Sequence, residues 1–174
     1  MSQAFSRPAG NRQTVASAVL LVGSVATITS ALLFQYVGGY MPCELCLLQR
    51  WPYYLSAPLA LVALAAAAGR APAMLTRGLL VVIGLLMLFG FGTAIYHAGV
   101  EWHFWAGPAD CTSSGGVDLS GDLLSAIDTI KPPACDEAPW RMLGLSFAGW
   151  NVLASLVFVV VAFWGASAKP NRWA

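Results

Sequence analysis

The stretch GLLVVIGLLMLFGFGTAIYH, residues 78–97, runs for 20 residues without a charged side chain. About 20 apolar residues are what an α-helix needs to cross the hydrocarbon core of a bilayer. Together with three similar stretches it predicts transmembrane helices over 14–37, 47–68, 78–97 and 145–166. A helix satisfies its backbone polar groups internally, as lipid requires. We therefore expect an all-α integral membrane protein, built as a four-transmembrane-helix bundle.

Composition supports this interpretation. The chain is 58% hydrophobic and only 10% charged, whereas soluble domains carry about 25% charged residues. The first apolar segment, 14–37, exceeds the roughly 7–15 apolar residues of a signal peptide, so we interpret it as a membrane anchor. We expect residues 1–174 to form a single membrane domain.

The distribution of positive charge predicts the orientation. Four spans place both termini on one side of the membrane, and the opposite side holds only Lys131 and Arg141 in its loops, with Arg50 at the start of the second helix. By the positive-inside rule the side richer in basic residues is cytoplasmic. We thus expect both termini to be cytoplasmic. We take the membrane to be a bacterial inner membrane, whose outer side is the periplasm. The basic residues on the side of the termini are Arg7, Arg12, Arg70, Arg77, Lys169 and Arg172.

Two loops face the other, periplasmic side. The first is short, about 38–46, and the second is long, about 98–143. Within the long loop, apolar residues at helical spacing over 119–130 predict a short amphipathic helix. It lies either on the membrane surface or on the rest of the loop. Loops of this length tend to be functional or disordered.

All four cysteines fall on the periplasmic side: Cys43, Cys46, Cys111 and Cys135. That compartment is oxidising, so disulfides form and persist there. Four cysteines allow three connectivities, and sequence alone does not choose among them. Local spacing favours a Cys43–Cys46 bond, which leaves Cys111 with Cys135.

The Cys-x-x-Cys pair is better explained by reactivity than by structure. A Cys43–Cys46 bond closes almost no loop, so it restrains the unfolded chain little. Cys46 stands at the predicted start of the second helix, whose positive end favours a thiolate. Arg50 lies four residues on, on the same helix face. The alternative for Arg50 is a side chain that reaches out to lipid headgroups.

Other chemistries fit this pattern less well. Covalent haem attachment needs a histidine where Leu47 stands. A zinc site would need ligands from the second cysteine pair, His97 and His103, whose spacing is unlike known zinc motifs, so we expect no metal. Both histidines are more typical of the membrane interface than of a catalyst. We find no phosphate-binding glycine motif, no Ser-His-Asp signature and no nucleic-acid patch, so no nucleic acid is expected. Inert structural cysteines and a metal-binding or metal-transport protein remain the alternatives.

Aromatic residues cluster near the periplasmic boundary. We interpret the set as an aromatic belt at the lipid headgroups, of which one or two members could flank a bound aromatic ring. They are Trp51, Tyr53, Tyr54, Trp102, Phe104, Trp105, Trp140 and Trp150.

Three motifs, taken in order, resemble the disulfide bond formation protein B (DsbB) family. They are CELCLLQR at 43–50, YHAGVEWHFWAGPADC at 96–111 and CDEAPWRMLGLSFAGWN at 135–151. The resemblance spans nearly the whole chain. It implies a membrane thiol–disulfide oxidoreductase that reoxidises a DsbA-like periplasmic thioredoxin-fold protein and reduces a membrane quinone, ubiquinone or menaquinone. A dedicated, substrate-specific partner is an alternative to a general DsbA.

The resemblance also implies roles for the cysteines. Cys111 would form the mixed disulfide with the partner, and Cys135 would be its disulfide mate. Cys43 and Cys46 would form the inner pair, with Cys46 donating to the quinone.

Two further residues take roles by resemblance. Arg50 would stabilise the quinone site beside Cys46, and His97 would lie near that site.

Overall fold

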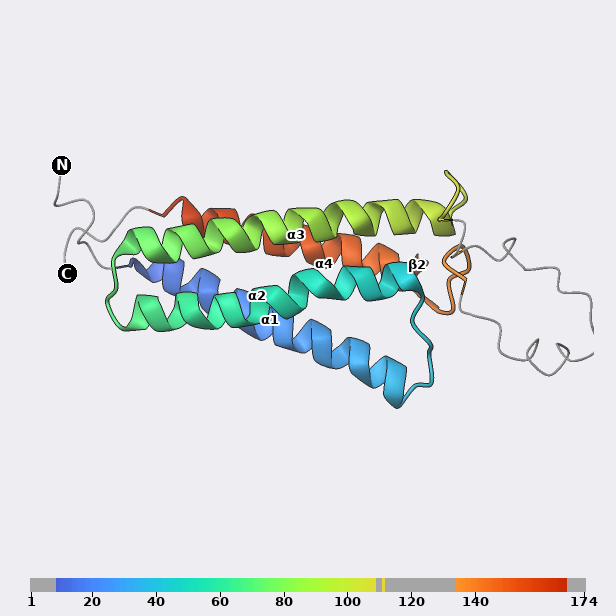
Figure 1. Cartoon of the computed structure of the whole chain (residues 1–174), viewed down its shortest axis with the longest axis horizontal. Helices are drawn as coiled ribbons and strands as arrows, with labels where there is room; N and C mark the ends of the chain where they lie inside the picture. The colour runs from blue at the N-terminus through green and yellow to red at the C-terminus, as the bar shows by residue number, and fades with distance from the viewer. Residues whose placement is uncertain (1–8, 109–110, 112–133, 169–174) are drawn as a thin grey trace, which may run out of the picture.

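The computed structural model describes residues 9–108, 111 and 134–168. Within them the chain forms four long helices, α1 (Asn11–Tyr36), α2 (Glu44–Ala68), α3 (Ala73–Glu101) and α4 (Phe147–Ala166). Each is long and apolar enough to cross a membrane. The predicted fold class, an all-α membrane protein with four spanning helices, is confirmed (Figure 1).

The helices form a bundle in which each packs on its neighbours in sequence, and α1 closes the ring against α4. The pair α1 and α3 barely touches, so these helices lie on opposite sides of the bundle. Small residues at the helix contacts let backbones approach closely, as in membrane bundles generally. The buried centre combines such residues with a few large ones, including Ala16, Ala60, Ala162, Leu20, Leu80, Ile83 and Met87.

Three of the observed helices, α1, α2 and α3, begin earlier than predicted, whereas α4 begins at Phe147 rather than 145. Helix α3 covers Ala73–Glu101 rather than 78–97, and the long loop therefore starts at 102 rather than 98. The predicted span lay within the charge-free run between Arg77 and Glu101, but the structure keeps both of these charged residues in the helix and gives each a partner. Arg77 donates to the backbone carbonyl of Ala168 at 2.6 Å, and Glu101 accepts a hydrogen bond from Ser146.

The second helix begins at Glu44 rather than 47, and Cys43 is its N-cap. Cys46 therefore lies inside the first turn, not before it. The amphipathic helix predicted over 119–130 lies outside the described residues.

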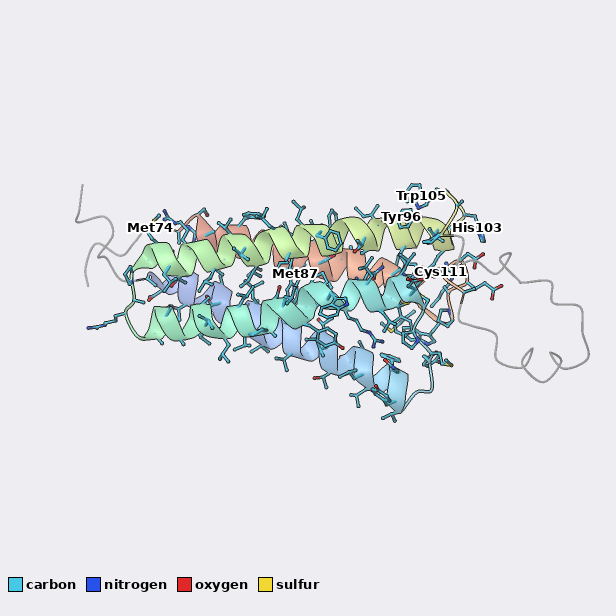
Figure 2. All side chains as sticks on the ribbon, in the orientation of Figure 1. Met74, Met87, Tyr96, His103, Trp105 and Cys111 are labelled. Carbon is cyan, nitrogen blue, oxygen red and sulfur yellow. A yellow bond between two sulfur atoms is a disulfide. The ribbon has the colours of Figure 1, made fainter. Side chains whose placement is uncertain are left out.

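The two ends of the bundle differ. The α2–α3 turn lies at the same end as the start of α1 and the end of α4, whereas the α1–α2 connection lies at the other (Figure 1). That second end also carries Cys111 (Figure 2). A two-stranded hairpin, β1 (Arg141–Met142) with β2 (Leu145–Ser146), leads into α4 there.

Candidate functional site

Two disulfides lie together at this end of the bundle. They join Cys43 to Cys46 and Cys111 to Cys135, the pairs that local spacing favours. Cys43, Cys111 and Cys135 are buried in one small cluster, and Cys46 packs against it. The long second loop and the short first loop therefore meet at their cysteines.

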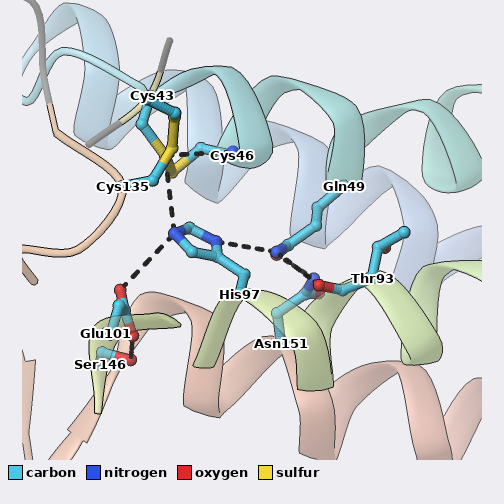
Figure 3. The surroundings of a disulfide bond; sticks show 10 residues. Cys43, Cys46, Gln49, Thr93, His97, Glu101, Cys135, Ser146 and Asn151 are labelled. Atoms are coloured by element: carbon cyan, nitrogen blue, oxygen red, sulfur yellow. Dashed lines mark hydrogen bonds and ion pairs between the residues drawn. A yellow bond between two sulfur atoms is a disulfide. The ribbon is translucent and has the colours of Figure 1, made fainter. Parts of the chain in front are cut away.

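The two pairs approach each other at Cys43 and Cys135. Their sulfur atoms and a ring nitrogen of His97 all lie within 4.8 Å of one another (Figure 3). Metals bind the thiolate form of cysteine, and both sulfurs are held in disulfides here. In this oxidised state the cluster is a junction between two disulfides.

The first turn of α2 shapes the inner disulfide. The Cys43 sulfur accepts a hydrogen bond from the Cys46 backbone N–H at 3.2 Å, the position that a capping side chain usually takes. Cys46 thus sits in the first turn of the helix, where backbone N–H groups have no partner within the helix and negative charge is stabilised. A thiolate released at Cys46 would be favoured by this position.

Beside Cys46 a cavity of about 410 Å³ opens between α1, α2 and α4. Its volume is within the range of small-molecule sites, about 300–1,000 Å³. Cys46, Arg50 and His97 contribute to its wall. Most other lining side chains are apolar, among them Ala26, Ile28, Ala31, Phe34, Phe147 and Ala154.

Arg50 points across this cavity toward α1. One of its guanidinium nitrogens donates to the Gln35 side-chain oxygen at 2.5 Å. The charged group is thus held between two helices of the bundle, rather than extended away from it as the headgroup alternative requires. An arginine has five N–H donors, and the contact with Gln35 uses one of them.

A chain of polar side chains runs along the cavity wall. The Tyr53 hydroxyl donates to Asn151 at 2.7 Å, and Asn151 donates to Gln49 at 2.7 Å. Gln49 in turn contacts His97 at 2.9 Å. Tyr53 is buried (2% exposed), so its placement in the aromatic belt was wrong.

A second, smaller cavity of about 220 Å³ lies next to the inner disulfide. His97, Cys46 and Cys43 line it together with Glu101 and Glu137. His97 and Cys46 line both cavities, so they stand in the wall between an apolar chamber and an acidic one.

Comparison with known proteins identifies the family. A family model described as "Disulfide bond formation protein DsbB" matches residues 13–165, which is most of the chain. The chain belongs to the DsbB family. A disulfide bond formation protein B from Polaromonas sp. (strain JS666) is 33% identical over 158 residues, covering 85% of each chain.

Two further relatives extend this result. Disulfide bond formation protein B from Aromatoleum aromaticum is 34% identical over 138 residues, which cover 75% of this chain and 78% of the relative. An uncharacterised protein of Rickettsia prowazekii is 25% identical over 153 residues, or 86% of each chain.

Membership in the DsbB family settles the general activity. The chain is a membrane oxidoreductase that forms disulfide bonds, and it is a multi-pass protein of the bacterial inner membrane. The DsbB family uses quinones in general and acts with a periplasmic disulfide partner.

The polar chain was missed by sequence reasoning, although a signal for it existed. Gln49 and Tyr53 are four residues apart on one face of α2, and Asn151 lies in the first turns of α4. Polar residues inside membrane spans are rare and usually face the bundle interior. That rule would have singled out all three.

Proposed function

We propose that this DsbB protein is a thiol:quinone oxidoreductase that reoxidises a DsbA-like periplasmic thioredoxin-fold protein. Electrons would pass through both cysteine pairs to ubiquinone or menaquinone. One observation carries the proposal: the Cys43–Cys46 disulfide lies between Cys135 and the apolar cavity, with Cys46 in the cavity wall.

Electrons enter at the outer pair. A thiolate of the reduced partner attacks Cys111, which forms a mixed disulfide and releases Cys135 as a thiolate. Thiol–disulfide exchange proceeds by such attacks on a disulfide sulfur. The second thiolate of the partner then attacks its own mixed-disulfide sulfur, so the partner leaves oxidised and Cys111 leaves reduced.

Cys135 carries the electrons to the inner pair. Its sulfur lies within 4.8 Å of the Cys43 sulfur, so it can attack with little movement. A Cys43–Cys135 bond forms, the Cys43–Cys46 bond breaks, and Cys46 leaves as a thiolate. When the Cys111 thiolate attacks Cys135 in turn, the outer disulfide is restored and Cys43 is freed as the second thiol of the inner pair.

Two features stabilise the leaving sulfur. Cys46 lies in the first turn of α2, and the positive end of a helix favours an anion there. Arg50, which lines the same cavity, adds a full positive charge. Since a more stable thiolate leaves faster, both features favour attack at Cys43 rather than at Cys46.

The cavity fits a quinone ring. Apolar walls suit a flat ring with a lipid tail, and the Arg50 guanidinium can donate to a ring oxygen. When bound, a quinone supplies an acceptor for two electrons and two protons. Arg50 would orient the ring beside Cys46, and the apolar side chains of α1 and α4 would exclude water from it.

The direction of the protein in the membrane follows from the same proposal. The cysteines lie at the end of the bundle opposite the start of α1 and the end of α4. A periplasmic partner must reach them, so we place that end in the periplasm and the termini in the cytoplasm. The positive-inside rule gives the same orientation.

Quinone reduction by the purified protein in detergent tests the proposal. The reaction is driven by a reduced thioredoxin-fold dithiol partner and followed by the loss of quinone absorbance. We expect turnover in the wild type and none in Cys46→Ser, while His103→Gln, an exposed residue outside both cavities, retains it. Full turnover in Cys46→Ser would remove Cys46 from the electron path. A wild type inactive with several quinones and partners would favour inert, structural cysteines.

A further inference from the structure

We infer that Gln49 is a positioning residue that holds the proton of the neutral His97 ring on Nε2, so that the ring presents an N–H group to the Cys43 sulfur. The family resemblance implies only that His97 lies near the quinone site, and the inference goes further than that. It assigns the protonated nitrogen, the residue that selects it and the sulfur that it serves.

The orientation of the Gln49 amide comes from its two contacts. Its Nε2 lies 2.9 Å from His97 Nδ1 and 3.4 Å from the backbone carbonyl oxygen of Thr93 (Figure 3). A carbonyl oxygen can only accept, so the NH₂ group of Gln49 must face it. An amide nitrogen can only donate, so His97 Nδ1 accepts and carries no proton.

The rest of the polar chain points the same way. Gln49 Oε1 accepts from Asn151 Nδ2 at 2.7 Å, and Asn151 Oδ1 accepts from the Tyr53 hydroxyl at 2.7 Å. Every bond thus donates from Tyr53 toward His97. The reverse assignment of the amides would set Gln49 Oε1 against the Thr93 carbonyl, two acceptors without a hydrogen between them. The backbone of α3 therefore fixes the direction of the chain.

The opposite side of the ring faces the disulfide junction. His97 Nε2 lies 3.7 Å from Cys43 Sγ and 3.9 Å from Glu101 Oε1. The Ser146 hydroxyl donates to the other carboxylate oxygen of Glu101, Oε2, so it does not occupy Oε1. A separation of 3.9 Å is nevertheless too long for an N–H···O hydrogen bond, and the charge of Arg141 also attracts this carboxylate. Cys43 Sγ is therefore the side-chain acceptor within hydrogen-bond range of the Nε2–H group. The backbone carbonyl of Cys135 is a second acceptor beside the ring. Other titratable groups facing this junction within the described residues are Cys46, Cys135 and Glu137.

The contact matters most when the inner disulfide is open. A disulfide sulfur is a weak acceptor, whereas hydrogen bonds to an ionised acceptor are roughly twice as strong as neutral ones. An N–H group held toward Cys43 would therefore stabilise its thiolate, the form that must re-form the bond with Cys46. This consequence rests on the proposed electron relay, but the position of the proton does not.

The first arm of the test observes the proton directly. Full-length protein carrying ¹⁵N-labelled histidine is studied by NMR in detergent micelles, with His103→Gln leaving His97 as the only histidine of the two in the chain. We expect His97 Nδ1 to be unprotonated in this His103→Gln variant, which keeps Gln49. In Gln49→Glu, which has nearly the same shape, a carboxylate accepts from Nδ1, so Nδ1 becomes protonated. A protonated Nδ1 with Gln49 in place, or no change with Gln49→Glu, would overturn the inference.

The second arm measures Cys43 without any quinone or partner. Cys46→Ser, Cys111→Ser and Cys135→Ser leave Cys43 as the only thiol, and its rate of alkylation reports the thiolate. In Gln49→Met the His97 ring is no longer held with its proton on Nε2, so the Cys43 thiolate loses a hydrogen bond. Losing a hydrogen bond to a charged acceptor should slow alkylation at pH 7 about 10-fold. At a pH high enough to ionise the Cys43 thiol fully, the alkylation rates of the protein with Gln49 and of the Gln49→Met variant should converge.

Gln35→Met is the matched control for this arm. It removes an amide from the same cavity that bonds Arg50 and not His97, so alkylation of Cys43 should stay within about 2-fold. Equal slowing by both variants, or slowing that is the same at every pH, would indicate general structural damage and refute the positioning role. Neither arm uses quinone turnover, so an inactive wild type would count against the proposed function alone.

Discussion

Replacing Arg50 with methionine tests the proposed quinone site most directly. Methionine keeps most of the length of the side chain but removes the charge and every donor. The Gln35 contact holds the guanidinium at the cavity between α1 and α2, leaving its remaining donors for a ring oxygen. A hydrogen bond to a charged group contributes about 1.5–3 kcal/mol. We therefore expect kcat/KM for the quinone to fall roughly 10- to 150-fold.

The assay varies the quinone at a saturating concentration of reduced dithiol partner and follows quinone absorbance. Thiol titration of the resting protein should show both disulfides formed, because the hydrogen bond found for Arg50 in the described part of the chain goes to Gln35 and not to a cysteine. Gln35→Leu is the comparison variant. It keeps the Arg50 charge but removes the side chain to which the guanidinium donates, so kcat/KM for the quinone should fall less than in Arg50→Met. Unchanged quinone kinetics in Arg50→Met, or a loss explained by unformed disulfides, would refute the assigned role.

Two further predictions concern the outer cysteines and the helix packing. Cys135→Ala should accumulate a mixed disulfide between the partner and Cys111, detectable by non-reducing electrophoresis and peptide mass spectrometry; attachment of the partner at Cys43 would overturn the order of exchange. Gly165→Ala places a methyl group 2.5 Å from Ala16 Cβ and 3.0 Å from Leu80, and this overpacking should lower the free energy of unfolding in detergent by about 1–3 kcal/mol. Gly78→Ala, with no atom within 4 Å of the added methyl, should change it little, and equal effects of both variants would contradict the packing argument.

The membrane architecture could be predicted from the sequence because lipid imposes a simple rule. Charge-free runs of about 20 residues mark spans, and all four predicted spans correspond to observed helices. Helix ends were less predictable, since a charged residue can stay helical when it finds a partner. Arg77 and Glu101 do so through Ala168 and Ser146, which are distant in sequence.

The candidate site was predictable in its residues but not in its geometry. Cysteine spacing indicated the two disulfides, and the family motifs singled out Arg50 and His97. No pattern showed that the Cys43 and Cys135 sulfurs approach each other, because 92 positions separate them. Nor did local sequence show that Asn151 of α4 completes a hydrogen-bond chain begun on α2, since that contact arises only when the helices pack.

The placement of the inner disulfide gives the proposed relay a direction. Cys43 lies at the junction with Cys135, and Cys46 lies in the wall of the large cavity. If Cys135 attacks Cys43, the departing negative charge appears on Cys46, beside Arg50 and the helix start. If the attack fell on Cys46 instead, the charge would appear on Cys43, which does not line the large cavity. In the proposed relay, one short Cys-x-x-Cys loop would therefore connect disulfide exchange at Cys43 with a lipid-soluble acceptor beside Cys46. The helix start would make the attack on Cys43 the easier one.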